Sequence, residues 1–396
     1  MNKKFILIFN ILVIFFINQY SIAYMHEFEF EKLHFEIEKN KSFLFNLNYN
    51  NNNLPQLGSH QGELCLGLAN ITELSDLLIA EYVHSEGMDI YSGKFFIRIP
   101  AIETKLSFGY EKSESSIETY PYDSLEIESD ADIYYISISQ PVYQTDSENL
   151  AFQFKYESMK LNTYMLGMNM SFTPGVIDGQ LEHSILRVAQ LWNKKSKSSK
   201  LTIKSTFSFG LDSYKTPKYI QQQSDIDGKF FAWLGEVSSE KKLLLLDSSM
   251  IFRADLQVSD EPLPDNYVNP SEHFSIGGLN SVRGYRKNLL TTDNGITASI
   301  EWRIPLFKIN FYSNKVNDGV VQIASFFDCG HGWNVKNNNP EIDSVYSLGL
   351  GLLWNISKTN FIKIYWGEAL RSIERITEYD LQDDGLSFFV NIGGAF

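Results

Sequence analysis

The chain has 396 residues, including 29 Phe, 21 Tyr and 6 Trp, and 21% of its residues are charged. Its net charge of −14 argues against nucleic acid as a partner, because nothing would offset phosphate repulsion, and is typical of solvated loops. After the first 25 residues, no stretch is long and apolar enough for a transmembrane helix. Many aromatic residues without long apolar runs suit strands that alternate apolar and polar residues.

The first residues form a targeting pattern. Lys3 and Lys4 precede an apolar run from Phe5 to Ile17, and Ser21-Ile22-Ala23 supplies small residues for a signal peptidase. The run is short for a membrane span, so we predict a secretory signal peptide over 1–23, cleaved after Ala23. This predicts Sec-type export, followed by a short periplasmic segment at 24–42.

Period-2 alternation recurs through the mature sequence and predicts an all-β chain. In the stretch from Leu150 to Glu157, for example, apolar residues alternate with polar ones. A β-sandwich would show the same alternation. We expect sixteen strands, at 43–50, 60–69, 75–84, 91–99, 103–112, 131–140, 149–158, 181–193, 200–211, 229–238, 243–258, 294–306, 320–328, 344–356, 360–368 and 385–396.

A further alternating stretch at 163–172 would make the count odd. Barrels of the bacterial outer membrane have even strand numbers, short periplasmic turns and longer extracellular loops. A strand at 163–172 would also place the long connection at 113–130 on the periplasmic side. We therefore interpret 163–172 as an extracellular extension and predict a 16-stranded antiparallel transmembrane β-barrel over 43–396, with both ends in the periplasm.

The sequence ends on an aromatic residue. The final alternating strand places Leu386, Phe388, Val390, Ile392 and Phe396 on one face. This ending resembles the terminal signal by which outer-membrane barrels are recognised and inserted by the barrel-assembly machinery. We predict that Phe396 is part of such an insertion signal.

The predicted loop at 259–293 carries the most specific motif of the chain. It contains a Ser-Ile-Gly-Gly run with Gly277 and Gly278, followed by Val282-Arg283-Gly284-Tyr285. Asp-Asn-Gly and then Glu301-Trp302-Arg303-Ile304-Pro305 come next. This series resembles the two-partner secretion translocators of the haemolysin secretion/activation family, within the BamA-like superfamily of outer-membrane barrels.

The resemblance implies that this long extracellular loop folds into the barrel and that Arg283 at its tip contacts the inner wall. The implied wall partner is the last residue of a Phe-x-Asp motif, which Phe326-Phe327-Asp328 matches. Strand parity independently places Phe326, Asp328, Glu301 and Arg303 on the lumen side. The glycines at 277, 278 and 284 would permit close or positive-φ backbone at the tip.

Interpretations without a specific functional role stay open for these residues. Arg283 and Asp328 could be no more than charged lumen residues, and Glu301 and Arg303 part of a polar wall. A basic run at Lys194, Lys195, Lys197 and Lys200 is typical of a solvated periplasmic turn. Cys65 and Cys329 are expected to be isolated thiols.

The sequence indicates no enzyme. The seven His residues show no metal-ligand spacing, and neither a nucleophile motif nor a phosphate-binding loop is found, so no cofactor or metal is expected.

The family resemblance implies a pore that exports a partner polypeptide, a haemolysin- or adhesin-like exoprotein, across the outer membrane. Two alternatives are a factor that assembles other barrels or moves lipid, and a passive porin-like channel. Family members normally carry periplasmic POTRA modules ahead of the barrel, and the 19 residues at 24–42 are fewer than the roughly 50 that a domain needs. How the client would dock is therefore left open.

Overall fold

The computed structural model describes residues 43–72, 75–171, 178–211, 229–260, 272–309, 318–335, 339–373 and 378–396. The predicted signal peptide (1–23), the segment 24–42 and residues 261–271 of the long loop lie outside this described part. No helix in the described residues is long and apolar enough to cross a membrane.

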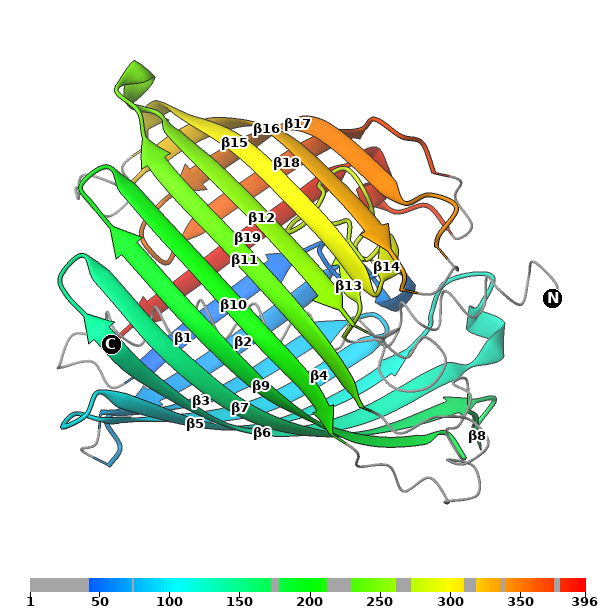
Figure 1. Ribbon diagram of the computed structural model, residues 1–396. Coiled ribbons are helices and arrows are strands. Elements are labelled where there is room, and N and C mark those ends of the chain that lie inside the picture. Colours follow the sequence, from blue (N-terminus) through cyan, green and yellow to red (C-terminus); the bar gives the residue numbers. More distant parts are fainter. Residues whose placement is uncertain are drawn as a thin grey trace.

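All of the described strands except two short ones in the long loop form one antiparallel sheet that closes on itself (Figure 1). The sheet has 17 strands, of which β8 (Met168–Asn169) is a two-residue return at the tip of β7, so sixteen strands make the wall. This confirms the predicted 16-stranded barrel. The wall strands are β1 (Phe43–Asn50), β2 (Gln61–Ala69), β3 (Asp76–Ser85), β4 (Met88–Ile99), β5 (Thr104–Ser116), β6 (Ile127–Gln144), β7 (Glu148–Met165), β9 (Gln180–Lys195), β10 (Ser199–Leu211), β11 (Phe230–Lys242), β12 (Ser249–Ser259), β15 (Asn294–Lys308), β16 (Val320–Trp333), β17 (Ser344–Asn355), β18 (Phe361–Ala369) and β19 (Leu386–Ala395).

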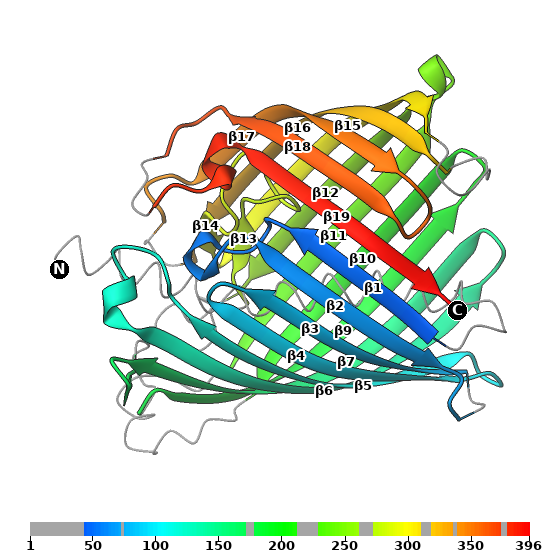
Figure 2. The same ribbon diagram turned by 180° about the vertical axis from the view of Figure 1, so that it is seen from behind.

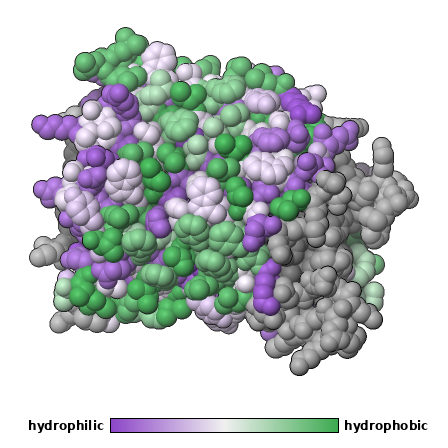
Figure 3. Space-filling model, in the orientation of Figure 1, coloured by the Kyte–Doolittle hydropathy of each residue, from purple (hydrophilic) through white to green (hydrophobic). Residues whose placement is uncertain are grey.

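Alternation along each strand separates an apolar outer surface from a polar lumen. On β17, Leu348, Leu350 and Leu352 are about half exposed, while Ser347, Gly349 and Gly351, which alternate with them, are buried. Successive side chains of a strand point to opposite faces, so the exposed leucines form the outer surface, which suits lipid. Figure 3 shows hydrophobic residues spread over this outer wall.

The connections differ between the two rims of the barrel. The turns at 145–147 and 196–198 are short and lie at the same rim as Phe43 and Phe396. The long connections, such as 260–293, lie at the other rim. By the rule that periplasmic turns are short, the rim with Phe43 and Phe396 is the periplasmic one.

Several strand boundaries differ from the prediction. The strand predicted from 243 begins at Ser249, because Leu243 to Leu246 do not alternate and instead form a turn with a short 3-10 helix, η3 (Leu245–Asp247). The described part of the predicted extension, 163–171, lies at the tip of β7, as predicted. Strands β5, β6, β7 and β16 are longer than predicted, because backbone pairing continues past the alternating apolar stretch.

Strands β1 and β19 close the barrel side by side (Figure 2). Seven residue pairs join them, from Leu44 opposite Ala395 to Asn50 opposite Phe389, whereas β18 and β19 share six. Phe43 and Phe396 exchange backbone hydrogen bonds of 3.2 and 2.9 Å at the periplasmic end. Phe396 itself is 70% exposed. Its role as an insertion signal stays a prediction.

The closed sheet predicts heat-modifiable migration on a detergent gel. Every wall strand is paired on both sides, so detergent at room temperature has no free edge at which to begin unfolding. We expect the unboiled protein to migrate faster than the boiled protein. Identical migration of the two samples would contradict a closed barrel.

Candidate functional site: the tip of the long loop

The described part of the long loop is a compact hairpin. Its two short strands, β13 (Phe274–Ile276) and β14 (Leu290–Thr292), pair with each other and carry the tip at 277–289. An apolar cluster holds the hairpin to the wall, and its buried members are Phe274, Ile276, Val282, Tyr285, Leu290 and, from β17, Val345. Val282, singled out in the sequence, is therefore a packing residue of the tip.

Three glycines give the tip its backbone path. Gly277, Gly278 and Gly284 have φ values of 114°, 91° and 89°, which residues with a side chain rarely adopt. A Cβ on Gly277 would also lie 2.3 Å from the carbonyl oxygen of Arg286. The motif therefore contains glycine at these positions for both conformational and steric reasons.

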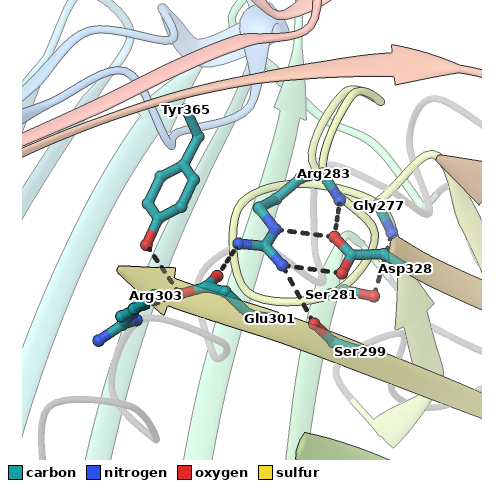
Figure 4. Close-up of polar contacts among 8 residues, drawn as sticks. All are labelled: Gly277, Ser281, Arg283, Ser299, Glu301, Arg303, Asp328 and Tyr365. Carbon is teal, nitrogen blue, oxygen red and sulfur yellow. Dashed lines mark hydrogen bonds and ion pairs between the residues drawn. The ribbon is translucent and has the colours of Figure 1, made fainter. Parts of the chain in front are cut away.

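Arg283 at the tip forms a bidentate pair with Asp328 on β16 (Figure 4). Its Nε donates to Oδ2 and its Nη2 to Oδ1, both at 2.8 Å, and its backbone N–H donates to Oδ2 at 3.1 Å. A planar guanidinium and a carboxylate match each other in this geometry.

The other donors of Arg283 reach β15. Nη1 pairs with Oε2 of Glu301, and Nη2 donates to Oγ of Ser299 at 3.1 Å. Glu301 also accepts from Nε of Arg303 and, at 3.4 Å, from the hydroxyl of Tyr365 on β18. Two carboxylates thus face two guanidinium groups, which balances the charge of the cluster.

Two aromatic rings complete the surroundings of Arg283. Its Cζ lies 3.6 Å from the centre of the Phe326 ring and 5.0 Å from that of Tyr365. A desolvated guanidinium is attracted to ring faces. Phe326, the first residue of the Phe-x-Asp motif, therefore stacks on the same side chain that Asp328 binds.

The cluster is almost entirely removed from water. The side chains of Arg283, Glu301 and Asp328 are 4%, 2% and 0% exposed. Burial disfavours the charged form of Arg283, but the hydrogen bonds to Asp328 outweigh it and raise the pKa of the guanidinium. The pair with Asp328 is costly to break, because Asp328 would be left behind as an unpaired buried charge.

The partners of Arg283 belong to the lumen side of the wall. Glu301 lies between the outward-facing Ile300 and Trp302, and Asp328 follows the exposed Phe327. The structure thus brings together Arg283, Phe326, Asp328, Glu301 and Arg303, the residues that the sequence assigned to the tip and the lumen.

Sequence reasoning missed the closest backbone contact of the site. Gly284 lies against Gly367 on β18, where a Cβ on Gly367 would lie 2.8 Å from the Gly284 nitrogen. Gly367 in turn donates its N–H to the carbonyl of Gly385 at 3.0 Å, just before β19. The signal available in the sequence was a lone glycine at a lumen position of β18.

Two further anchors of the loop were also missed. Beyond the tip, Arg286 forms a bidentate pair with Asp383, with both distances 2.6 Å, in the connection between β18 and β19. Tyr285 donates its hydroxyl to the carbonyl of Tyr346 at 2.8 Å. These contacts fix the tip to the extracellular end of β17 and to the segment that directly precedes β19.

The third anchor lies on a distant part of the wall. Glu272, just before β13, accepts from both Nη atoms of Arg187 on β9 at 3.0 and 2.8 Å. Strands β10, β11 and β12 separate β9 from β15 in the sheet order. The described loop is therefore fixed to two separated parts of the inner wall.

The barrel is similar in fold to several solved structures. CdiB from Escherichia coli matches with a TM-score of 0.72 and 14% identity, covering 90% of this chain and 64% of that one. CdiB from Acinetobacter baumannii matches with a TM-score of 0.66 and 15% identity, covering 90% and 60%. BamA from Haemophilus ducreyi lacking POTRA domains 1–3 matches with a TM-score of 0.61 and 13% identity, covering 91% and 71%.

The chain also matches a known protein family at the level of its sequence. A comparison with curated proteins found no match. The model of the haemolysin secretion/activation protein family ShlB/FhaC/HecB matches residues 32–353, which is most of the chain and includes the whole tip with Arg283, Glu301 and Asp328. The chain therefore belongs to the haemolysin secretion/activation protein family ShlB/FhaC/HecB and is an outer-membrane β-barrel of sixteen strands.

Proposed function

We propose that this protein is a polypeptide-transporting pore that exports a partner exoprotein, haemolysin- or adhesin-like, across the outer membrane. The observation that carries the proposal is the set of buried ion pairs that Arg283 forms with Asp328 and Glu301, in a barrel that belongs to a secretion family. A passive pore needs no such charge cluster between a loop and its wall.

In this proposal the loop is a movable element of the pore. The docked tip lies on lumen-facing side chains of β15, β16 and β18, so a polypeptide that uses this space must displace it. The gating role of the tip residues Gly277, Gly278, Val282, Arg283, Gly284 and Tyr285 follows from this. Folding of the exported client outside the cell would supply the driving force.

The second candidate is a factor that assembles other barrels. The structural likeness to BamA favours it, and it would use the junction of β1 and β19 as a lateral opening. Seven residue pairs and the mutual backbone bonds of Phe43 and Phe396 close this junction here. The closed junction favours transport through the lumen.

Deletion of the gene, followed by comparison of secreted and outer-membrane proteins, tests the proposal. Loss of one exoprotein from the medium, with an unchanged set of outer-membrane barrels, is the expected result. Loss of several barrels from the membrane would favour the assembly factor. If neither fraction changes, the export proposal is wrong and a passive channel is favoured.

A disulfide across the closing junction separates the two candidates further. Asn48 and Asn391 lie opposite each other on β1 and β19, and both side chains are buried on the lumen side. We expect the Asn48→Cys, Asn391→Cys variant to cross-link under oxidation and to keep full export. Reductant-dependent migration after boiling measures the cross-link, and each single variant is the control. Export that stops on oxidation and returns on reduction would show that the junction must open.

A further inference from the structure

The turn between β11 and β12 presents an apolar surface that the transport function does not use. Leu244, Leu245 and Leu246 are 101%, 63% and 58% exposed. In Figure 1 this turn projects beyond the barrel at the upper left, and Figure 3 shows it as a hydrophobic protrusion at the same place. We call residues 243–248 the leucine turn.

The leucine turn has a defined conformation. Leu246 and Asp247 have positive φ values of 57° and 48°, and the hydroxyl of Ser248 donates to the carbonyl of Leu245 at 2.6 Å. The indole nitrogen of Trp302, on the outer face of β15, donates to the same hydroxyl at 2.9 Å. One bond within the turn and one bond from Trp302 on the neighbouring strand β15 therefore hold the three leucines outward.

The apolar surface of the turn continues the lipid-facing surface of the barrel. Ser249 pairs with Arg303, so the end of β15 runs on beside the turn, and Leu306 and Phe307 there are 51% and 57% exposed. The outward-facing Phe252 of β12 leads into the turn from the other side. A tryptophan at the boundary is typical of the membrane–water interface.

Lysines lie beside this apolar surface, on the adjoining end of β11 and on the β9–β10 turn. The basic run on the β9–β10 turn reaches the leucine turn directly, because the backbone N–H of Lys242 donates to the carbonyl of Ser198 at 2.7 Å. Lys194 pairs with Glu148 and Lys200 with Glu240. Four exposed lysines form no ion pair with the described residues: Lys195, Lys197, Lys241 and Lys242. Asp247 is the one acidic residue of the turn itself.

We infer that the leucine turn inserts into the periplasmic leaflet of the outer membrane and that these four lysines bind anionic phospholipid headgroups beside it. The occupant is a phospholipid, since the surface is continuous with the lipid-facing wall. Apolar side chains that enter the acyl region beside basic ones at headgroup level are a combination that anionic membranes bind. A periplasmic protein is the competing occupant.

A nitroxide label at position 245 measures the depth of the turn. The label is placed by Leu245→Cys in a Cys65→Ala, Cys329→Ala background, and the matched control is Asp146→Cys on the exposed periplasmic turn between β6 and β7. Both proteins are reconstituted in vesicles of phosphatidylcholine, with and without phosphatidylglycerol. We expect the ratio of oxygen to nickel-complex accessibility at 245 to exceed that at 146 several-fold. Equal ratios in both lipids would overturn the inference.

The role of the four lysines is tested by the same measurement of label depth at position 245. With Lys195, Lys197, Lys241 and Lys242 changed to Gln, we expect the additional depth that phosphatidylglycerol gives to position 245 to disappear. Unchanged dependence on phosphatidylglycerol would overturn the headgroup part. A label that is exposed to water in vesicles, together with an unlabelled Leu245→Cys thiol that a membrane-impermeant thiol reagent does not modify in isolated outer membranes, would show that a protein covers the turn and that the lipid inference is wrong. Heat-modifiable migration checks that each variant is folded.

Discussion

Arg283→Ala will release the tip of the long loop while leaving the barrel folded. The substitution removes the side-chain bonds of Arg283 to Asp328 and Glu301, both of which stay buried in the wall, and only Glu301 keeps a second partner in Arg303. Breaking one side of a buried pair costs about 3–5 kcal/mol, which lowers the equilibrium constant for docking of the tip by about a hundredfold or more. We expect trypsin to cleave after Arg286 or Lys287 in the variant and to spare the wild type, and export to fall accordingly.

Arg253→Ala is the matched control for this experiment. Arg253 is also an arginine on the lumen side, on β12 close to Arg283, but it forms no hydrogen bond or ion pair with the residues that the structure describes. Its loss changes the lumen charge by the same amount. A tip that resists trypsin in both variants would show that the charge cluster does not hold the loop.

Gly367→Val will displace the tip without removing any charge. A Cβ at this position would lie 2.8 Å from the Gly284 nitrogen and 3.0 Å from the carbonyl carbon of Arg283. Overpacking typically costs about 1–3 kcal/mol, and backbone atoms on the facing side leave little room for relaxation. Valine suits strand backbone, so β18 itself should form. We expect trypsin sensitivity and an export defect similar to those of Arg283→Ala, with normal heat-modifiable migration.

Gly93→Val on β4 shows whether the position matters. Gly93 is also a strand glycine, but a Cβ there meets nothing within 4 Å. This variant should export normally and keep a protected tip. Should Gly367→Val also behave like the wild type, the close approach of Gly284 and Gly367 would not be needed for docking.

The sequence predicted the barrel and the lumen-facing positions because both depend on local alternation, whereas the pairing of Arg283 with Asp328 was implied by the family resemblance. Parity alone placed Glu301 and Asp328 on the inner face, and the even strand count followed from connection lengths. The strand predicted from 243 was wrong at its start, because a run of four leucines carries no alternation to separate strand from turn.

The anchors outside the motif depend on the path of the loop across the lumen. Glu272 and Arg187 are 85 residues apart, and Arg286 and Asp383 are 97 apart. No sequence periodicity relates the two residues of such a pair, because their contact depends on where the hairpin of the loop docks on the wall. Tyr365 and Gly367 were likewise visible only as lumen positions of β18 until the tip was placed against them.

Gly367 is also a mechanical junction of three chain segments. Its backbone touches the loop tip at Gly284 and bonds to Gly385, and a Cβ on Gly385 would lie 1.9 Å from the Gly367 oxygen. Gly385 immediately precedes β19, the strand that closes the barrel. Withdrawal of the tip would therefore remove the inner support of the point from which the last strand starts. The occupancy of the lumen and the rigidity of the closing strand are therefore coupled through Gly367.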